Sequence, residues 1–269
     1  MFSYFGQARG LRLYLIGFFF LSFHALTAQY AERVRTTRPS VTMGTYTVGK
    51  NVLQWQTGLQ FRDIEKEAST TSVFQYKTVV RLGILENWEL NGVINYEKDE
   101  INAGNSHSSK VGISALRLGT RYHFFDGKGF VRAGAIQGRL WFQSPSDDFQ
   151  QAHIGGRLMT SIAYGLVGKL GLVTNVGVFW RGNETPASTF FSLRLTQPLN
   201  KKLILVADYF SPFEDFEPDY ALGFGYYLHK ELKLDIAVGW LGKEGLQDRY
   251  VEVGFATRVD WRKEKRGLN

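Results

Sequence analysis

The sequence predicts an all-β protein: a cleaved signal peptide followed by a transmembrane, antiparallel up-and-down β-barrel of about 12 strands. Three observations predict this class. The last strand alternates apolar and polar side chains, similar segments recur along the chain, and the connections between them are alternately long and short. The composition agrees, because aromatic residues (15%) and glycines (29) are plentiful while prolines (6) are scarce.

The final strand, residues 250–261, shows the alternation over its full length. Val251, Val253 and Phe255 lie on an apolar face that ends at Trp261, while the opposite face holds small or charged side chains. Such a run is long for a soluble sandwich and matches the length that a tilted strand needs to cross a bilayer. A transmembrane barrel must pair its last strand with its first, because an open edge in lipid would leave backbone groups without partners.

The N-terminus predicts export. Arg9 and Arg12 precede an apolar run at 13–23, and Ala28 supplies a small residue at the cleavage point, so we expect residues 1–28 to be a signal peptide. A retained membrane anchor is the alternative, but the apolar run is too short to span a bilayer. The chain has no cysteine, which excludes disulfides, thiolate metal sites and a lipoprotein anchor. The net charge of +7 is spread along the chain and does not predict a nucleic-acid interface.

Three parts are expected after the signal peptide: an arm at 29–50, in the periplasm or the lumen, a transmembrane barrel at 51–261 and a periplasmic tail at 262–269. The arm is rich in Thr, Arg and Gly and has little hydrophobic period. The first barrel strand, 51–61, is the clearest, because Trp55 and its apolar partners alternate with glutamines. Glutamine side chains belong in water, so this second face is expected to line an aqueous lumen.

The remaining strands are expected between polar connections that alternate in length. The outer loops are expected at 62–72, 98–109, 143–152, 182–186, 211–219 and 241–248, and the short turns at 86–87, 126–129, 167–170, 198–202 and 229–231. Of the strands between them, only 130–142 alternates poorly. With the short turns on the periplasmic side, both termini are periplasmic and the outward aromatic residues fall into two girdles. Trp88 and Phe124 belong to the girdle near the turns, and Phe61 and Trp240 to the one near the loops.

The same alternation places ionisable side chains inside the barrel. The candidates for contact with the lumen or with a solute are Lys77, Arg81, Glu89, Arg117, Arg121, Arg157, Arg194, Asp208, Asp235, Glu252 and Arg258. A barrel of this size encloses a backbone cylinder about 25 Å across, which side chains narrow to about 10 Å. Two interpretations remain open. The charges form ion pairs that fill a closed barrel, or the arginines contact anionic solutes on a selective path.

The arm directly precedes the first strand and carries several arginines. Docking into the barrel mouth could form charge-assisted hydrogen bonds with the inward carboxylates of Glu89 and Glu252. Ordering the chain costs about 1 kcal/mol or more per residue, and a few ion pairs cannot offset that cost over the whole arm. We therefore expect only residues 38–50 to be held, with Arg38 as the anchor.

Catalytic and metal chemistry finds little support. The histidines outside the signal peptide have no carboxylate cluster around them that suits a metal. The acidic loop 215–219 could hold a calcium ion with its oxygens, but a solvated loop is the simpler interpretation. An acyl hydrolase on a barrel of this size would need a serine and a histidine on the lipid-facing surface, and the outward positions offer neither. We expect no enzymatic activity, no metal and no cofactor.

Three stretches resemble a known family. The run 38–58, which contains Arg38-Pro39-Ser40-Val41-Thr42 and Tyr46-Thr47-Val48-Gly49-Lys50, resembles the N-terminal signature of the phenol meta-degradation-pathway outer-membrane proteins, often called simply "transporter". The stretches 81–90 and 112–122 agree with the same family. The chain carries Ser40, Met43, Gln56 and Ala115 at positions that are acidic in the family.

The resemblance implies an outer-membrane barrel of a Gram-negative bacterium that passes small, often aromatic, solutes. We accordingly expect a porin-like channel or transporter in the outer membrane, for small organic solutes of aromatic or anionic character. Its partners are expected to be outer-membrane lipid, the solute and the barrel-insertion machinery, with no nucleic acid. The alternative is a structural or adhesive barrel whose lumen is closed by ion pairs and which transports nothing.

Overall fold

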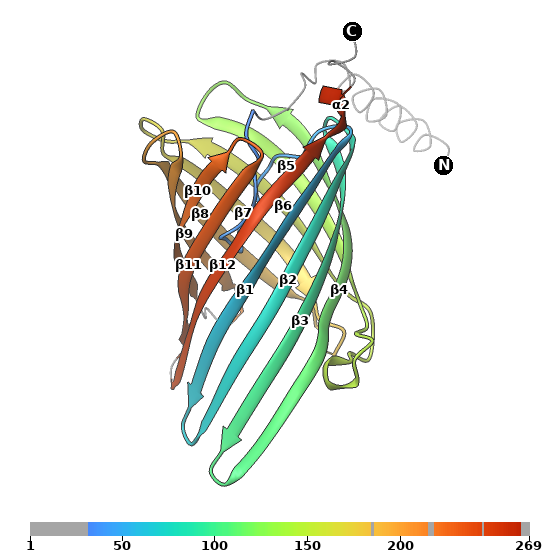
Figure 1. Ribbon diagram of the computed structural model, residues 1–269, viewed down its shortest axis with the longest axis vertical. Helices are drawn as coiled ribbons and strands as arrows, with labels where there is room; N and C mark the ends of the chain where they lie inside the picture. Colours follow the sequence, from blue (N-terminus) through green and yellow to red (C-terminus); the bar gives the residue numbers. More distant parts are fainter. Residues whose placement is uncertain (1–31, 184–185, 215–217, 244, 265–269) are drawn as a thin grey trace, which may run out of the picture.

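The computed structural model describes residues 32–183, 186–214, 218–243 and 245–264, whose strands form a closed antiparallel barrel (Figure 1). The strands are β1 (Val52–Lys66), β2 (Ser69–Leu85), β3 (Trp88–Ala103), β4 (Ser106–Asp126), β5 (Val131–Phe142), β6 (Gly155–Gly165), β7 (Gly171–Trp180), β8 (Ser188–Pro198), β9 (Leu203–Pro212), β10 (Asp219–His229), β11 (Leu232–Lys243) and β12 (Leu246–Asp260). A 3-10 helix, η1 (Asp147–Phe149), lies in one loop, and α2 (Trp261–Glu264) follows β12. The predicted all-β barrel is confirmed, while the predicted signal peptide, 1–28, lies outside the described residues, as does 265–269 of the predicted tail.

The barrel closes between its first and last strands. β1 pairs antiparallel with β12, from Val52 opposite Asp260 to Lys66 opposite Leu246, and every other strand pairs with its neighbours in sequence. The wall therefore has no terminal edge for lipid to meet. In the described residues, no helix is long and apolar enough to cross a membrane.

The two ends of the barrel differ. The turn end, at the top of Figure 1, carries the short connections, the start of β1 and the end of β12. The five predicted short turns all lie there, within a residue or two of their predicted bounds. The loop end, at the bottom of Figure 1, carries the other connections. Both described termini therefore lie at the turn end.

Three of the predicted outer loops, 62–72, 98–109 and 241–248, are wrong. The strands continue through these segments as long hairpins, and β1 to β4 extend below the rest of the barrel in Figure 1. Polar side chains pair across these strands, as Arg62 does with Asp248. A strand that projects beyond the bilayer needs no apolar face, which is why hydrophobic alternation does not reveal it.

β4 extends further toward the loop end than β5, since their pairing begins only at Leu116. The connection between β5 and β6, which contains η1, covers part of this free edge. The side chain of Ser146 accepts a hydrogen bond from the backbone N–H of Ile113 (2.9 Å), and Asp148 accepts one from Val111 (2.9 Å). The loop thus supplies acceptors that a neighbouring strand would otherwise supply.

Side chains alternate between the outer face and the lumen as predicted. Trp55 is 50% exposed on the outer face, whereas its neighbours Gln54 and Gln56 are each 1% exposed inside. The poorly alternating segment forms β5, in which Arg139 and Trp141 both face the lumen opposite inward residues of β4 and β6. The core of this protein is therefore a lumen with a mixed polar and aromatic lining.

Candidate functional site

Residues 32–50, called the arm from here on, lie inside the barrel and cross its lumen without forming a helix or strand (Figure 1). Val34, Thr42 and Thr45 have no exposed surface. A segment without secondary structure must find partners elsewhere for its backbone groups when it is buried. The inner face of the barrel supplies them.

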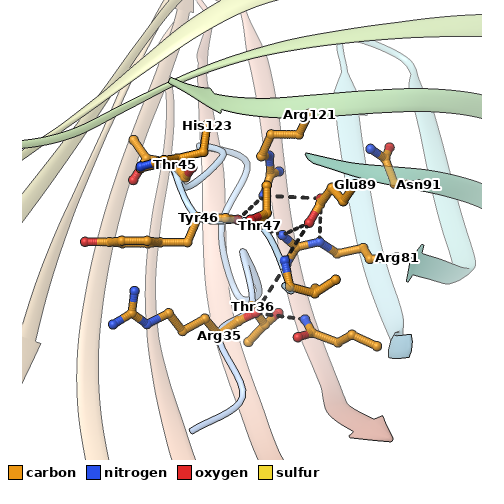
Figure 2. A network of polar contacts seen from close by, with 12 residues as sticks. Arg35, Thr36, Thr45, Tyr46, Thr47, Arg81, Glu89, Asn91, Arg121 and His123 are labelled. Carbon is orange, nitrogen blue, oxygen red and sulfur yellow. Dashed lines mark hydrogen bonds and ion pairs between the residues drawn. The ribbon is translucent and has the colours of Figure 1, made fainter. Parts of the chain in front are cut away.

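The first group of contacts joins the arm to β2, β3 and β4 (Figure 2). Arg81 Nη2 and Arg121 Nη1 both donate to the carbonyl oxygen of Tyr46, at 2.8 and 2.9 Å. Glu89 accepts a hydrogen bond from the backbone N–H of Val48 at 2.9 Å. Glu89 also accepts bonds from Arg81 Nε and Nη2, at 2.8 and 2.7 Å, and lies 3.6 Å from Arg121 Nη1. The three wall residues form a buried ion cluster that is complete only with the arm in place.

The opposite wall binds the arm in the same way. Asp208 Oδ2 accepts bonds from the backbone N–H groups of Val41 and Thr42, at 2.6 and 3.2 Å. Asn175 bonds to both the N–H and the carbonyl oxygen of Met43. In the described chain, every strand except β5 and β6 provides a side chain that hydrogen-bonds to the arm.

Arg38 is the arm's main ionic contact. Its Nε donates to Asp235 Oδ1 at 3.1 Å, and its Nη1 lies 3.7 Å from Glu252. Two inward glycines leave room for the guanidinium, because a Cβ atom at Gly58 or Gly254 would lie only 2.2 or 2.4 Å from Arg38 Nη2. Small residues on the inner face therefore help to form the site in which the arm binds.

The expected extent of the ordered arm and one of its expected partners are wrong. The sequence predicts that only 38–50 is held, whereas hydrogen bonds to the arm begin at Glu32, and the Val34 N–H donates to the Lys230 carbonyl at 2.7 Å. A few ion pairs do not offset the cost of ordering the arm, but most of its contacts are hydrogen bonds between wall side chains and the arm backbone. Glu89, expected to meet an arginine of the arm, is occupied by Arg81 and Arg121 from the wall.

The candidate lumen residues all face the interior, in two classes. Most bond to each other or to the arm: Arg81, Glu89, Arg121, Arg194, Asp208, Asp235, Glu252 and Arg258. The others, Lys77, Arg117 and Arg157, have no carboxylate within ion-pair distance among the described residues. Contact of either class with a solute stays a prediction.

Two cavities lie on either side of the arm. The loop-side cavity, of about 180 Å³, is lined by Lys77 and several arginines together with arm residues such as Ser40. The turn-side cavity, of about 260 Å³, is lined by Arg35, Tyr46 and residues of β6 to β10. Thr37 and Arg38 of the arm line both cavities, so the arm lies between the two spaces.

Sequence reasoning missed several inward residues. Arg139 lines the loop-side cavity, and a row of rings runs along the inner wall: Trp141, Phe179, Phe190 and Phe210, with successive centroids 6.3, 6.0 and 5.5 Å apart. Alternation identifies Phe179 and Phe190 as inward, because their neighbours are outward. It fails for β5, where apolar side chains stand on both faces.

No group of three or more histidine and acidic side chains suited to a metal exists in the described part of the chain. His123 is fully buried, and its Nδ1 lies 3.1 Å from the carbonyl oxygen of Thr45 in the arm. Its ring stacks on Tyr46 with centroids 6.2 Å apart (Figure 2). The acidic loop 215–219, considered above as a calcium site, includes residues 215–217, which lie outside the described residues.

The comparisons with known proteins agree on the fold. Residues 36–259 match the model of the family described as "Putative MetA-pathway of phenol degradation". An outer membrane channel from Pseudomonas putida F1 has a TM-score of 0.60 and 9% identity, over 82% of this chain and 100% of that one. The KdgM porin in complex with oligogalacturonate has a TM-score of 0.51 and 8% identity, over 74% of this chain and 98% of that one. No curated protein matches the chain.

Proposed function

The chain belongs to the family described as "Putative MetA-pathway of phenol degradation", and we propose that it is an outer-membrane channel for small organic solutes, closed at rest by its N-terminal arm. The turn end, from which the arm enters, faces the periplasm, and the long hairpins face the outside. Its partners are then outer-membrane lipid, the solute and the machinery that inserts barrels. The inner-wall side chains serve binding and passage, and we assign them no catalytic step.

The proposal rests on the way in which the arm is held. Side-chain hydrogen bonds and ion pairs hold it across the lumen, whereas strand ladders hold the wall. These contacts use no ladder hydrogen bond of the wall, so departure of the arm would leave every strand pairing of the barrel in place. Cavities on both of its sides already provide space for water and small solutes.

The structural neighbours support the same class of function. One is an outer membrane channel of Pseudomonas putida F1, and another is a porin whose structure contains oligogalacturonate. Their identities to this chain are 9% and 8%, so their solutes are not transferred. The shared barrel supports a channel, and the solute has to be argued from the lumen of this chain.

A permanently closed structural or adhesive barrel is the second candidate. The arm fills the middle of the lumen, and the cluster of Arg81, Glu89 and Arg121 joins it to the wall by buried bonds. If the arm never leaves, the same contacts stiffen the barrel and no solute passes.

Reconstitution separates the two candidates. Mature protein is folded into liposomes and planar bilayers, and folding is checked by the heat-dependent shift of its gel mobility. A channel gives stepwise conductance events and allows liposomes to swell in gradients of small sugars, amino acids and aromatic acids. Folded protein that shows neither conductance nor swelling would favour the closed barrel.

A further inference from the structure

The loop-side cavity contains a surplus of positive charge. Lys77, Arg117, Arg139 and Arg157 line it together, and none has a carboxylate within ion-pair distance in the described chain. The carboxylates that line the cavity, Glu89 and Glu252, are engaged by Arg81, Arg121 and Arg38. Cations gathered in one cavity without paired carboxylates repel one another and favour a bound anion.

The neutral groups in this cavity carry spare donors as well. Asn91 is 4% exposed, and its Oδ1 accepts bonds from Arg139 Nε and Nη2, at 3.2 and 2.8 Å, while its Nδ2 has no partner in the described chain. Gln56 is similarly buried, with its Oε1 bonded to Thr36 and its Nε2 unpartnered. A buried donor without an acceptor costs free energy, so the two amide N–H groups also favour a bound ligand that carries hydrogen-bond acceptors.

The arginines of this cavity also meet the row of rings. The Arg117 guanidinium carbon lies 4.9 Å from the Trp141 ring centroid, and that of Arg157 lies 5.7 Å from Phe190. Phe190 and Met159 are almost fully buried in the same apolar cluster, which Met43 of the arm joins. Charge and an apolar surface therefore adjoin at the arginines.

We propose that Lys77, Arg117, Arg139 and Arg157 form a binding subsite for the carboxylate of a small organic acid, whose apolar ring or chain packs against the apolar part of the cavity lining, Val41, Met43 and Val79. Planar guanidinium groups bind carboxylates through paired hydrogen bonds, which gives orientation as well as charge. The cavity of about 180 Å³ has room for about six water molecules, or for one small organic anion in their place. This inference deepens the proposed channel function and names its solute class.

The subsite adjoins a second cavity toward the loop end, and Arg117 lines both. This second cavity, of about 460 Å³, also has Trp141 in its lining and lies between the middle of β4, the end of β5 and the loops before β6 and after β7. On the other side, the arm closes the subsite from the turn end. An anion that enters from the loop end therefore meets the arm at the subsite itself, where Ser40, Val41 and Met43 form part of the lining.

Calorimetric titration of the folded protein in detergent micelles tests the subsite without requiring conductance. The probes are benzoate, benzyl alcohol, acetate and inorganic phosphate, each with a blank of empty micelles. Benzoate is expected to bind at least tenfold more tightly than benzyl alcohol, which lacks the charge, and than acetate, which lacks the ring. Tighter binding of phosphate than of benzoate would overturn the organic-acid assignment in favour of an inorganic anion site.

Variants locate the site. Arg139→Gln and Arg157→Gln are each expected to weaken benzoate binding about tenfold, while Arg249→Gln removes the same charge from an exposed hairpin pair and leaves binding unchanged. Equal affinity in all three variants would overturn the inference. If a variant does not fold, Arg139→Lys and Arg157→Lys keep the charge and lose the paired geometry, and are expected to bind with intermediate affinity.

The same proteins in planar bilayers distinguish this inference from the channel proposal. Benzoate binding without conductance would refute the channel and leave the subsite in place. Conductance with no benzoate binding would refute the subsite alone. With both correct, the wild-type channel prefers anions in a KCl gradient, and Arg157→Gln shifts the reversal potential toward zero.

Discussion

Asn175 on β7 bonds to both backbone polar groups of Met43 in the arm: its Oδ1 accepts from the Met43 N–H at 2.7 Å, and its Nδ2 donates to the Met43 carbonyl at 2.9 Å. The pair is buried and spans 132 residues of sequence. An amide side chain can satisfy a whole peptide group in this way, as a neighbouring strand would. Asn175 therefore substitutes for a strand at the centre of the lumen.

Replacing Asn175 by alanine should release the middle of the arm. Both polar groups of Met43 lose their partner, at a cost of about 1 to 3 kcal/mol per buried group left unsatisfied. Single-channel recordings of Asn175→Ala should show openings at least about tenfold more frequent than in the wild type. Asn102→Ala removes an amide from the exposed β3–β4 hairpin, where it contacts His107, and should leave the opening frequency unchanged. Equal behaviour of both variants would argue against a gating role of the contact.

Gly58→Ala should displace Arg38. The added Cβ atom would lie 2.2 Å from Arg38 Nη2 and 2.6 Å from the Val253 carbonyl oxygen, so the guanidinium has to move away from Asp235. We expect trypsin to cleave the arm of the folded variant several-fold faster than that of the wild type, as measured by mass spectrometry. Gly92→Ala is the matched control, because its new Cβ atom would meet only Leu118 at an ordinary 3.6 Å. Unchanged cleavage in Gly58→Ala would contradict the position of Arg38 against Gly58 and Asp235.

Glu89→Gln should destabilise the barrel more than any exposed charge change. Neutralising this buried carboxylate leaves Arg81 and Arg121 without their anion, which costs about 3 to 5 kcal/mol. The unfolding temperature, read from the heat-dependent gel shift, should fall clearly. Glu65→Gln breaks only an exposed pair with Arg249 and should cost at most about 1 kcal/mol. Similar unfolding temperatures for the two variants would show that the cluster carries little of the stability.

Much of the wall could be predicted from the sequence because its signal is local. Trp55 between two glutamines predicts an outer and an inner face, and lipid on one side with water on the other enforces that alternation. The hairpin at 98–109 could not be predicted in this way, since water surrounds both of its faces and its polar residues look like a loop. The alternation in β5 is weak for the opposite reason, because its inner Trp141 is as apolar as its outer Leu140.

The arm and the site depend on contacts that no sequence period records. Arg121 donates to the carbonyl oxygen of Tyr46, 75 residues away, and any residue at position 46 other than Tyr would offer the same backbone acceptor. The sequence therefore indicates the binding site of the arm only indirectly, through inward glycines such as Gly58 that leave room for it. Alternation predicted that Lys77, Arg117 and Arg157 face the lumen, but their lack of carboxylate partners became evident only from the structure.

The proposed channel requires that the arm close an otherwise continuous lumen, and deletion of the arm is the sharpest test of this closure. Protein lacking 29–50 is compared in planar bilayers with the full mature chain and with protein lacking 29–37. The shorter deletion removes the bonds of Val34 and Arg35 but keeps Arg38 and Met43, so it should open intermittently. The longer deletion should give a stable open pore with a conductance several times that of the full chain. If folded protein without the arm conducts no better than the full chain, the arm does not close the lumen.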